Sequence, residues 1–365
     1  MHTKIEELLK RVTDEKASDL FLKAGAPAFL RVGGELIPCS PERLSEADLL
    51  ELADRYMGSE RQKALKVNRE INFAFNQDGI GRFRANAYFE KGSLALVIRL
   101  IQGEIQSLEE LDLPAEPLKQ IMEASHGLLL ITGRTGSGKS TTAASVLEHL
   151  NQTKACHIVT LEDPIEFLLK EKKAVVSQRE VGLDTLSFEE GLKSIFRQSA
   201  DVLFISDIYD QRVMEIVLLA AESGQMVVSC LHAANVINAL ERVIAFFPEH
   251  QQPAVQFRLS LALRGIVSQR LLPRQGGSGL IPACEVMVAT PTMTKLLREG
   301  RLVEMPPLME EGGIQGMQTL CQALYQRVHR RQVEAEAALK VADSPEELEL
   351  ALREIRATKD VRSPR

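Results

Sequence analysis

The stretch Gly133-Arg134-Thr135-Gly136-Ser137-Gly138-Lys139-Ser140 has the spacing G-x-x-x-x-G-K-[ST], which is typical of a loop that binds nucleotide phosphates. An apolar run precedes it and a helix-forming segment, Thr141 to Leu150, follows it. Glycines let backbone N–H groups turn onto a phosphate, and the helix N-terminus adds a positive dipole end. We expect Lys139 to reach the phosphates and Ser140 to ligate Mg²⁺. A glycine-rich turn with a surface lysine is the alternative, but residues 133–141 are predicted to bind Mg²⁺ and ATP.

The composition indicates a globular protein of more than one domain. The chain has 365 residues, of which 45% are hydrophobic and 26% are charged. The net charge of −6 argues against a broad nucleic-acid surface, and no nucleic-acid partner is expected. No apolar run approaches the roughly 20 residues of a membrane span, and the N-terminus lacks a signal-peptide core. The five cysteines contain no C-x-x-C pair, which excludes a zinc ribbon and fits a reduced cytoplasm.

Residues 1–102 are predicted to form a small α+β domain with an antiparallel sheet. A hairpin is expected around Gly33-Gly34, and a second helix is expected to start at Ser45 and end near Gly58. Three strand-like segments follow between Glu70 and Ile101. Residues 103–115 carry charge and are interpreted as a linker.

Residues 116–343 are predicted to form an α/β domain with a parallel sheet, because strand and helix patterns alternate there. The expected strands are 127–132, 156–161, 201–206 and 226–231, and the expected helices are 139–151, 187–199 and 211–223. The end of this domain is expected to be helical. Residues 344–365 are predicted to be a further helix, started by Ser344-Pro345, and a tail that frays from Ala357.

Two strands of this domain end in carboxylates. The strand 201–206 leads to Asp207, the arrangement of a Walker B motif, whose carboxylate holds Mg²⁺ or orients the attacking water. The second strand leads to Glu162-Asp163, and Pro164 forces a turn after them, so both acids lie at the edge where ligands bind. The alternatives are an ordinary acidic residue at a strand end and a solvated acidic turn. We expect Asp207 to bind the metal with Ser140, and Asp207 and Glu162 to take part in hydrolysis.

His232 ends the fourth expected strand. A histidine at this edge is placed to contact or sense the γ-phosphate, although a lone histidine is more often structural.

Together these motifs resemble the type IV pilus retraction ATPases (the PilT/PilU type) of the type II/IV secretion ATPase superfamily. The resemblance covers nearly the whole chain, and the stretches that carry it are Ala17-Ser18-Asp19-Leu20, Arg31-Val32, Gly34-Glu35-Leu36, Gly81-Arg82-Phe83-Arg84-Ala85-Asn86, Val97-Ile98-Arg99, Thr160-Leu161-Glu162-Asp163-Pro164-Ile165-Glu166-Phe167, Gln178-Arg179-Glu180-Val181-Gly182, Ala220-Ala221-Glu222-Ser223-Gly224, Leu231-His232 and Gly316-Met317-Gln318-Thr319. His232-Ala233-Ala234-Asn235 and Ala245-Phe246-Phe247-Pro248-Glu249 lean toward the PilU branch. The zinc insertion of related assembly and secretion ATPases is absent.

The resemblance implies a homo-hexamer whose subunits have a PAS-like N-terminal domain joined to a RecA-like P-loop ATPase domain. ATP would lie between domains, and arginines of the N-terminal domain would help to neutralise its phosphates. The matching positions here are Arg84 and Arg99, although an ordinary solvated strand face explains them equally well. A cytoplasmic location at the inner membrane, through a pilus platform protein, is implied as well.

The chain also departs from the pattern of that family. The family sequence Gly-Glu-(Met/Ile)-Arg-Asp is Ser206-Asp207-Ile208-Tyr209-Asp210 here, so the glutamate is shortened to Asp207. There are three further departures. This chain has Gln225 where the family has a histidine, Arg134 where the family's P-loop has a proline, and Ser199-Ala200 where the family has Asp-Pro. Because a misplaced water costs on the order of a hundredfold in rate per ångström, we expect intact nucleotide binding and weakened hydrolysis.

Three interpretations remain open from the sequence. The first is a retraction motor for twitching motility that hydrolyses ATP. The second is a catalytically damped accessory or regulatory subunit that acts with an active paralogous retraction ATPase. The third is a motor of a related secretion or competence pilus system.

Overall fold

The computed structural model describes residues 2–101, 103–277 and 279–360 of the chain. The chain divides into two compact units. The first unit comprises Met1–Glu104 and Glu166–Leu168, and the second comprises Ile105–Ile165 and Leu169–Arg365. No helix in the described ranges is long and apolar enough to cross a bilayer.

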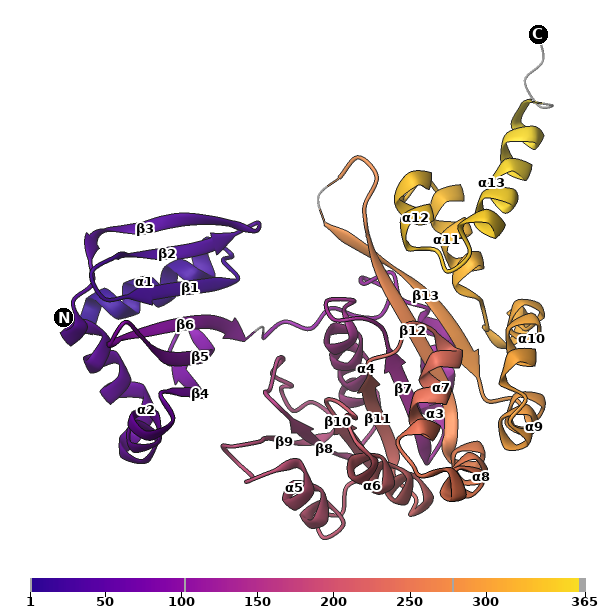
Figure 1. Ribbon diagram of the computed structural model, residues 1–365, viewed down its shortest axis with the longest axis horizontal. Coiled ribbons are helices and arrows are strands. Elements are labelled where there is room, and N and C mark those ends of the chain that lie inside the picture. The colour runs from indigo at the N-terminus through magenta and orange to yellow at the C-terminus, as the bar shows by residue number, and fades with distance from the viewer. Residues whose placement is uncertain (1, 102, 278, 361–365) are drawn as a thin grey trace. The chain divides into compact units, whose positions relative to one another are not determined.

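The first unit is built on a six-stranded antiparallel sheet with strand order β3-β2-β1-β6-β5-β4 (Figure 1). Its elements are α1 (His2–Asp14), β1 (Asp19–Lys23), β2 (Pro27–Val32), β3 (Glu35–Arg43), α2 (Glu46–Asn68), β4 (Glu70–Gln77), β5 (Gly81–Glu90) and β6 (Ser93–Ile101). Apolar side chains of α1 recur at helical spacing and are buried, among them Leu8, Leu9 and Val12. This unit is therefore the α+β fold that the sequence predicts.

The second helix of this unit is longer than predicted. Ser45 caps it in a reciprocal capping box with Asp48. The helix continues past Gly58, the predicted end, to Asn68, and Gly58 forms a kink with φ 71° and ψ 165°. Glycine tolerates this backbone conformation, so it interrupts the helix here without ending it.

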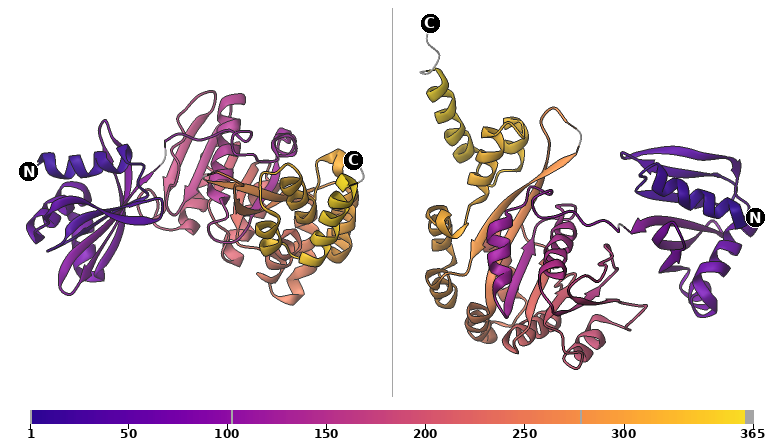
Figure 2. Two further views of the ribbon diagram at one scale, coloured as in Figure 1. Left: turned by 90° about the horizontal axis from the view of Figure 1, so that it is seen from above. Right: turned by 180° about the vertical axis from the view of Figure 1, so that it is seen from behind.

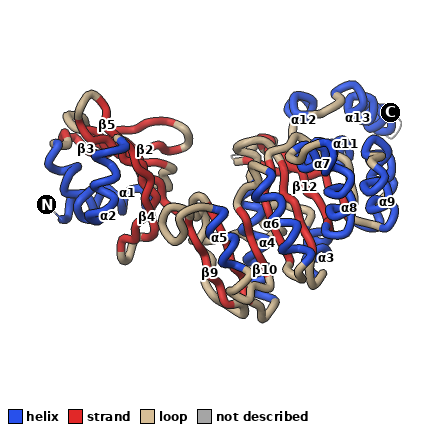
Figure 3. Tube along the Cα trace, turned by 60° about the horizontal axis from the view of Figure 1, so that its bottom comes forward, coloured by secondary structure: helices blue, strands red, loops and turns tan. Residues whose placement is uncertain are grey.

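The second unit contains a seven-stranded sheet with strand order β13-β12-β7-β11-β10-β8-β9 (Figure 3). The strands are β7 (Gly127–Thr132), β8 (His157–Glu162), β9 (Val175–Glu180), β10 (Val202–Ile205), β11 (Met226–Leu231), β12 (Leu263–Pro273) and β13 (Leu280–Val288). Every neighbouring pair is parallel except β12 with β13. The parallel α/β sheet is confirmed, whereas β9, β12 and β13 were not among the predicted strands.

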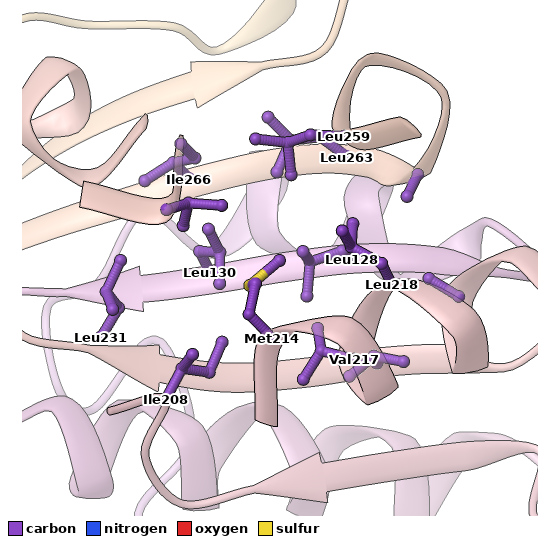
Figure 4. Close-up of a cluster of buried hydrophobic side chains, with 14 of the residues drawn as sticks. Leu128, Leu130, Ile208, Met214, Val217, Leu218, Leu231, Leu259, Leu263 and Ile266 are labelled. Carbon is purple, nitrogen blue, oxygen red and sulfur yellow. The ribbon is translucent and has the colours of Figure 1, made fainter. Parts of the chain in front are cut away.

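Helices cover both faces of this sheet, because alternate side chains of each strand point to opposite faces. On one face Leu129 and Ile131 pack with α3 (Ala115–Glu123) and α4 (Lys139–Thr153). On the other face Leu128 and Leu130 share a core with six helices, and Figure 4 shows Met214 of one of them lying among these leucines. These helices are α5 (Phe188–Ile195), α6 (Gln211–Glu222), α7 (Val236–Ala245), α8 (Gln252–Ala262), α9 (Pro291–Glu299) and α10 (Met305–Glu311).

The chain ends in a small helical bundle, which we call the C-terminal bundle. It consists of α11 (Leu320–His329), α12 (Ala335–Val341) and α13 (Pro345–Asp360) and packs on the β12–β13 hairpin (Figure 2). Short 3₁₀ turns precede it at Glu249–Gln251, Leu302–Glu304 and Gly313–Gln315. Leu324 and Leu348 are buried together with Leu272 of β12. The predicted separation of residues 344–365 from 116–343 is therefore not a boundary in the fold, and the last tail residues, 361–365, lie outside the described residues.

The predicted linker, residues 103–115, is largely part of the second unit. Leu108 and Leu113 are buried in the core that contains α3 and α4. Asp112 pairs with Arg274 at 2.5 Å, and its carbonyl accepts a hydrogen bond from Arg327. Residues 105–113 therefore pack as a fixed strap, because their leucines are apolar enough to be buried despite the charges between them.

Candidate nucleotide site at the carboxyl edge of the sheet

The P-loop connects β7 to α4 at the carboxyl edge of the parallel strands. A side chain at Gly133, where φ is 152°, would place its Cβ 2.3 Å from Ser137 Oγ and 2.7 Å from the Gln269 carbonyl. Gly138 has φ 86° and stands just before the first residue of α4. Both positions therefore require glycine, and the loop closes tightly around its own backbone N–H groups.

Lys139 lies inside the loop and points at its centre. Its side chain is buried, and Nζ donates hydrogen bonds to the carbonyls of Gly133 and Arg134, each at 3.1 Å. Nζ also lies 3.4 Å from His232 Nδ1. The ammonium group is a donor only, so Nδ1 accepts and the imidazole proton resides on Nε2.

His232 connects Lys139 to Asp207. His232 Nε2 lies 3.4 Å from Asp207 Oδ2, so the imidazole proton faces the carboxylate. The other oxygen, Oδ1, is buried and has no hydrogen-bond partner among the described residues. Burial raises the pKa of Asp207, and electrostatic attraction to His232 and Lys139 offsets part of this effect. The structure thus brings three of the predicted site residues, Lys139, Asp207 and His232, into one cluster.

Glu162 lies at the same edge, at the end of β8, and its carboxylate is engaged. Its Oε1 accepts a hydrogen bond from Thr160 Oγ1 at 2.6 Å and from Gln178 Nε2 at 3.1 Å. The next residue, Asp163, donates its backbone N–H to Ser206 Oγ at 3.3 Å. The ends of β8 and β10 are therefore linked one residue before Asp207.

Gln269 is a residue that the sequence analysis missed. Its Nε2 donates to the Ser137 carbonyl at 2.6 Å, and its Oε1 accepts from Thr142 Oγ1 at 2.8 Å. It thereby fixes the loop to the first turn of α4. The sequence signal is weak, because Gln269 stands on β12, which pairs with β7 although it lies about 135 residues further along the chain.

Two hollows adjoin the P-loop. One measures about 510 Å³ and is lined by Gly133, Arg134, Thr135, His232, Ala233, Ala234, Asn238 and Arg242. The other measures about 350 Å³ and is lined by loop and α4 residues together with apolar side chains of the strap and the hairpin, including Leu111, Leu113, Leu271 and Leu280. The first includes the cationic side chains of Arg134 and Arg242, which can pair with phosphates, and the second includes leucines that can pack against a nucleobase.

The residues at this edge fit Mg²⁺ and a nucleoside triphosphate. Ser137 Oγ, Thr132 Oγ1 and Asp207 Oδ1 are buried and lack a hydrogen-bond partner in the part of the chain that the structure describes. Hydroxyl and carboxylate oxygens are the ligands that Mg²⁺ prefers. Within that same part, no group of three or more His, Cys, Asp or Glu side chains is arranged to hold a metal by itself. Such a site would therefore depend on phosphate oxygens for most of the metal ligands.

Arg84 and Arg99 belong to the first unit, where they face each other on β5 and β6. Arg99 donates from Nε and Nη2 to Asp19 Oδ1 at 2.9 and 2.7 Å. Both arginines line a hollow of about 130 Å³ with Asn72 and Asn86. The two guanidinium groups are thus close neighbours, and a buried carboxylate orients one of them.

The departures from the family pattern lie at two different edges of the sheet. Gln225 and Ser199-Ala200 precede β11 and β10, at the amino edge, opposite the P-loop. Arg134 and Tyr209 lie at the carboxyl edge, where Tyr209 packs edge-to-face against Phe188 with ring centroids 5.7 Å apart. Only the second pair shares an edge with Asp207.

The chain is similar to known proteins over nearly its whole length. Residues 2–344 match the family described as T2SSE, type II/IV secretion system protein. The type IV pilus ATPase PilU of Pseudomonas aeruginosa is 39% identical over 95% of this chain and 91% of its own length. The retraction ATPase PilT of the same organism is 37% identical over 94% of this chain and 99% of its own length.

A solved structure has the same fold over nearly the whole chain. The crystal structure of the pilus retraction motor PilT with bound ADP superposes with a TM-score of 0.89 at 39% identity, covering 95% of this chain and 99% of that one. The protein is a member of the type II/IV secretion ATPase family and, within it, of the type IV pilus retraction ATPases of the PilT and PilU kind.

Proposed function

We propose that this protein is an ATP-binding motor subunit of type IV pilus retraction, and so of twitching motility, with hydrolysis weakened at Asp207. The observation that carries the proposal is the cluster of Lys139, His232 and Asp207 against the P-loop. Its relatives over nearly the whole chain are named pilus ATPases.

The residues of the cluster have separate roles in this proposal. Lys139 leaves the carbonyls of Gly133 and Arg134 and pairs with the phosphates when ATP binds. Ser140 and Asp207 would hold Mg²⁺, which would supply charge neutralisation at the phosphates. His232 carries a proton on Nε2 toward Asp207 and so holds the carboxylate in place.

Asp207 is the reason to expect weak hydrolysis. An aspartate reaches about 1.5 Å less far than a glutamate from the same strand end, which is the length of one carbon–carbon bond. This shorter reach would weaken water activation while leaving the phosphate loop intact.

The remaining predicted residues complete the site in the proposal. Glu162 contributes to the orientation of water through the polar network that it forms with Thr160 and Gln178. Arg84 and Arg99 supply positive charge to the phosphates from the N-terminal unit. Their side-by-side placement on β5 and β6 supports a joint role.

The proposed assembly is a homo-hexamer on the cytoplasmic side of the inner membrane. It would act on a membrane platform protein of the pilus and would work beside an active paralogous retraction ATPase. The similarity to both PilU and PilT supports an assignment to a system that contains two such ATPases.

A second function is favoured by one observation. Asp207 in place of glutamate is the change that a catalytically damped accessory subunit would carry, with the paralogue supplying the turnover. A motor of a secretion or competence pilus has the same site chemistry, and the genes that flank this one distinguish that alternative.

The test of nucleotide binding uses Lys139→Ala in the full chain. The affinity for Mg-ATP is measured for wild type and variant, together with steady-state phosphate release. We expect the variant to lose more than about tenfold in affinity, because a buried cation at the phosphates is removed. Equal affinities would remove the P-loop assignment.

A further inference from the structure

The short loop after β11, residues 232–236, carries His232 and is anchored to the β12–β13 hairpin. The Ala234 carbonyl accepts hydrogen bonds from Ser268 Oγ at 3.2 Å and from Arg270 Nη2 at 3.3 Å. The Val236 N–H donates to Glu285 Oε2 at 2.8 Å. The hairpin therefore determines where this loop stands, and with it the imidazole of His232.

Arg270 also contacts the C-terminal bundle. Its Nη1 donates to the carbonyl of Val341, the last residue of α12, and its Nη2 forms an ion pair with Asp343. The carbonyl at a helix C-terminus carries partial negative charge and favours a cation. The Arg270 side chain is only 15% exposed but that of Asp343 is 46% exposed, so solvent screens the contact with the Val341 carbonyl less than the ion pair. One guanidinium group therefore joins the His232 loop to the junction of α12 and α13.

We infer that Arg270 is a positioning residue that transmits the position of the C-terminal bundle to His232 and thereby sets the rate of ATP turnover at the P-loop. The inference rests on the turnover proposed above. His232 lies 3.4 Å from both Lys139 and Asp207, at the limit of a useful hydrogen bond. A displacement of the loop by a few tenths of an ångström therefore strengthens or breaks both contacts.

The bundle is suited to act as one body in this link. Its helices share a core with the outer part of the hairpin, which includes Leu272 and Ile281. A partner that binds the bundle would thus move residues 341–343. Because the guanidinium group of Arg270 contacts both these residues and the Ala234 carbonyl, the carbonyl would move with them. Arginine is needed because its planar fork reaches two acceptors at once, whereas an ammonium group is a point charge.

The link is tested first without nucleotide, by hydrogen–deuterium exchange of the full chain. The variants are Arg270→Gln, Asp343→Ala and Asp343→Asn, and the matched control is Arg258→Gln, which removes a bidentate ion pair with Glu222 on α6. We expect the peptide over residues 232–238 to exchange about threefold faster or more in Arg270→Gln and Asp343→Ala. Asp343→Asn keeps an acceptor oxygen and restores protection, and the control leaves this peptide unchanged.

The decisive result is that of Asp343→Ala, because Asp343 reaches the loop through Arg270. Faster exchange confined to residues 335–350 in this variant would overturn the inference, even if Arg270→Gln unfolded. Faster exchange over residues 232–238 in the control as well would also overturn it, since the effect would then be general loosening.

Turnover is tested second, by steady-state phosphate release. We expect Arg270→Gln and Asp343→Ala to change kcat by about fivefold or more while KM stays within about twofold, and Asp343→Asn to stay near wild type. If the wild type is active and kcat is unchanged in Arg270→Gln and Asp343→Ala, the inference is overturned but the proposed function is not. A wild type that neither binds Mg-ATP nor releases phosphate would overturn the proposed function, while the exchange result still decides whether the link exists.

Discussion

In the proposed function, Asp207 is the residue on which turnover depends most directly. Its Oδ2 faces His232, its Oδ1 is buried without a partner among the described residues, and burial raises its pKa. A longer carboxylate from the same strand end would reach further toward a phosphate-bound water. In the proposed function, the side chain is therefore too short for efficient activation of water.

We expect Asp207→Glu to raise kcat by about 10- to 100-fold, because a misplacement of one ångström costs on the order of a hundredfold. Phosphate release is measured for wild type, Asp207→Glu and Asp207→Ala, each with a check of equal nucleotide affinity. Ordinary family rates in the wild type and no gain in the variant would contradict a damped site. If the wild type does not hydrolyse ATP and Asp207→Glu does not raise the rate, the loss of hydrolysis would be assigned to Arg134 or Tyr209, which lie at the same edge. That result would favour the accessory subunit.

Glu285 makes stability depend on pH. Burial raises its pKa to about 7 from 4.5, so the native protein holds a proton between these values that the unfolded chain releases. The stability that this proton contributes is present below about pH 4.5 and is lost as pH rises through about 7. Above pH 7 the buried carboxylate is charged and destabilises the fold.

We therefore expect Glu285→Gln to be more stable than wild type at pH 8, by at most about 3 kcal/mol, and nearly equal to it at pH 5. Glutamine keeps an oxygen that accepts the Val236 N–H. Urea unfolding at the two pH values measures the difference, with the exposed Glu336→Gln as control. A difference that does not grow between pH 5 and pH 8 would refute the assignment.

At the scale of elements, α9 presents two basic residues in different surroundings. Lys295 has a side chain that is 70% exposed and lies only 3.9 Å from Glu299. The Arg298 guanidinium stacks over Phe257 of α8 at 5.2 Å and lies 3.4 Å from Ser260 Oγ. One residue is therefore available to a partner, whereas the other holds α9 on α8.

We expect Lys295→Ala to spare stability and nucleotide binding but to abolish twitching, if this helix contacts a partner. Arg298→Ala is expected to lower the free energy of unfolding by about 1 kcal/mol through the lost cation–π contact. Urea unfolding, nucleotide affinity and twitching of complemented cells are measured for both. Joint loss of nucleotide binding and twitching in Lys295→Ala would indicate unfolding instead of a lost partner.

At the scale of the whole molecule, assembly is the property that the proposed function needs most. Arg84 and Arg99 lie in a compact unit separate from the one that holds the P-loop. The proposed hexamer would be a closed, symmetric assembly of such subunits.

We expect a ring of six subunits, stabilised by Mg-ATP through mass action. The mass of the assembly is measured at micromolar concentration with and without Mg-ATP. Lys139→Ala is the control, and Mg-ATP should not stabilise the ring of this variant. A strict monomer under both conditions would count against the motor and against the accessory subunit alike.

Local patterns in the sequence determined the P-loop, the antiparallel sheet, four strands of the parallel sheet and several helices of this protein. Loop geometry depends on glycines at fixed spacing, and strands and helices depend on apolar periodicity, which are properties of neighbouring residues. Strand ends also placed Asp207 and His232 at one edge, since parallel strands align their carboxyl ends.

Only the tertiary structure decided which distant side chains meet. Gln269 at the P-loop and Arg270 at the His232 loop stand on β12, whose place beside β7 depends on long-range pairing. The strap of residues 105–113 was predicted to be a linker because it is rich in charged residues, yet two of its leucines are buried in the core. Gln225 looked like a change at the catalytic site, but it lies at the opposite edge of the sheet. Such relations arise from packing across the whole chain, which no local pattern encodes.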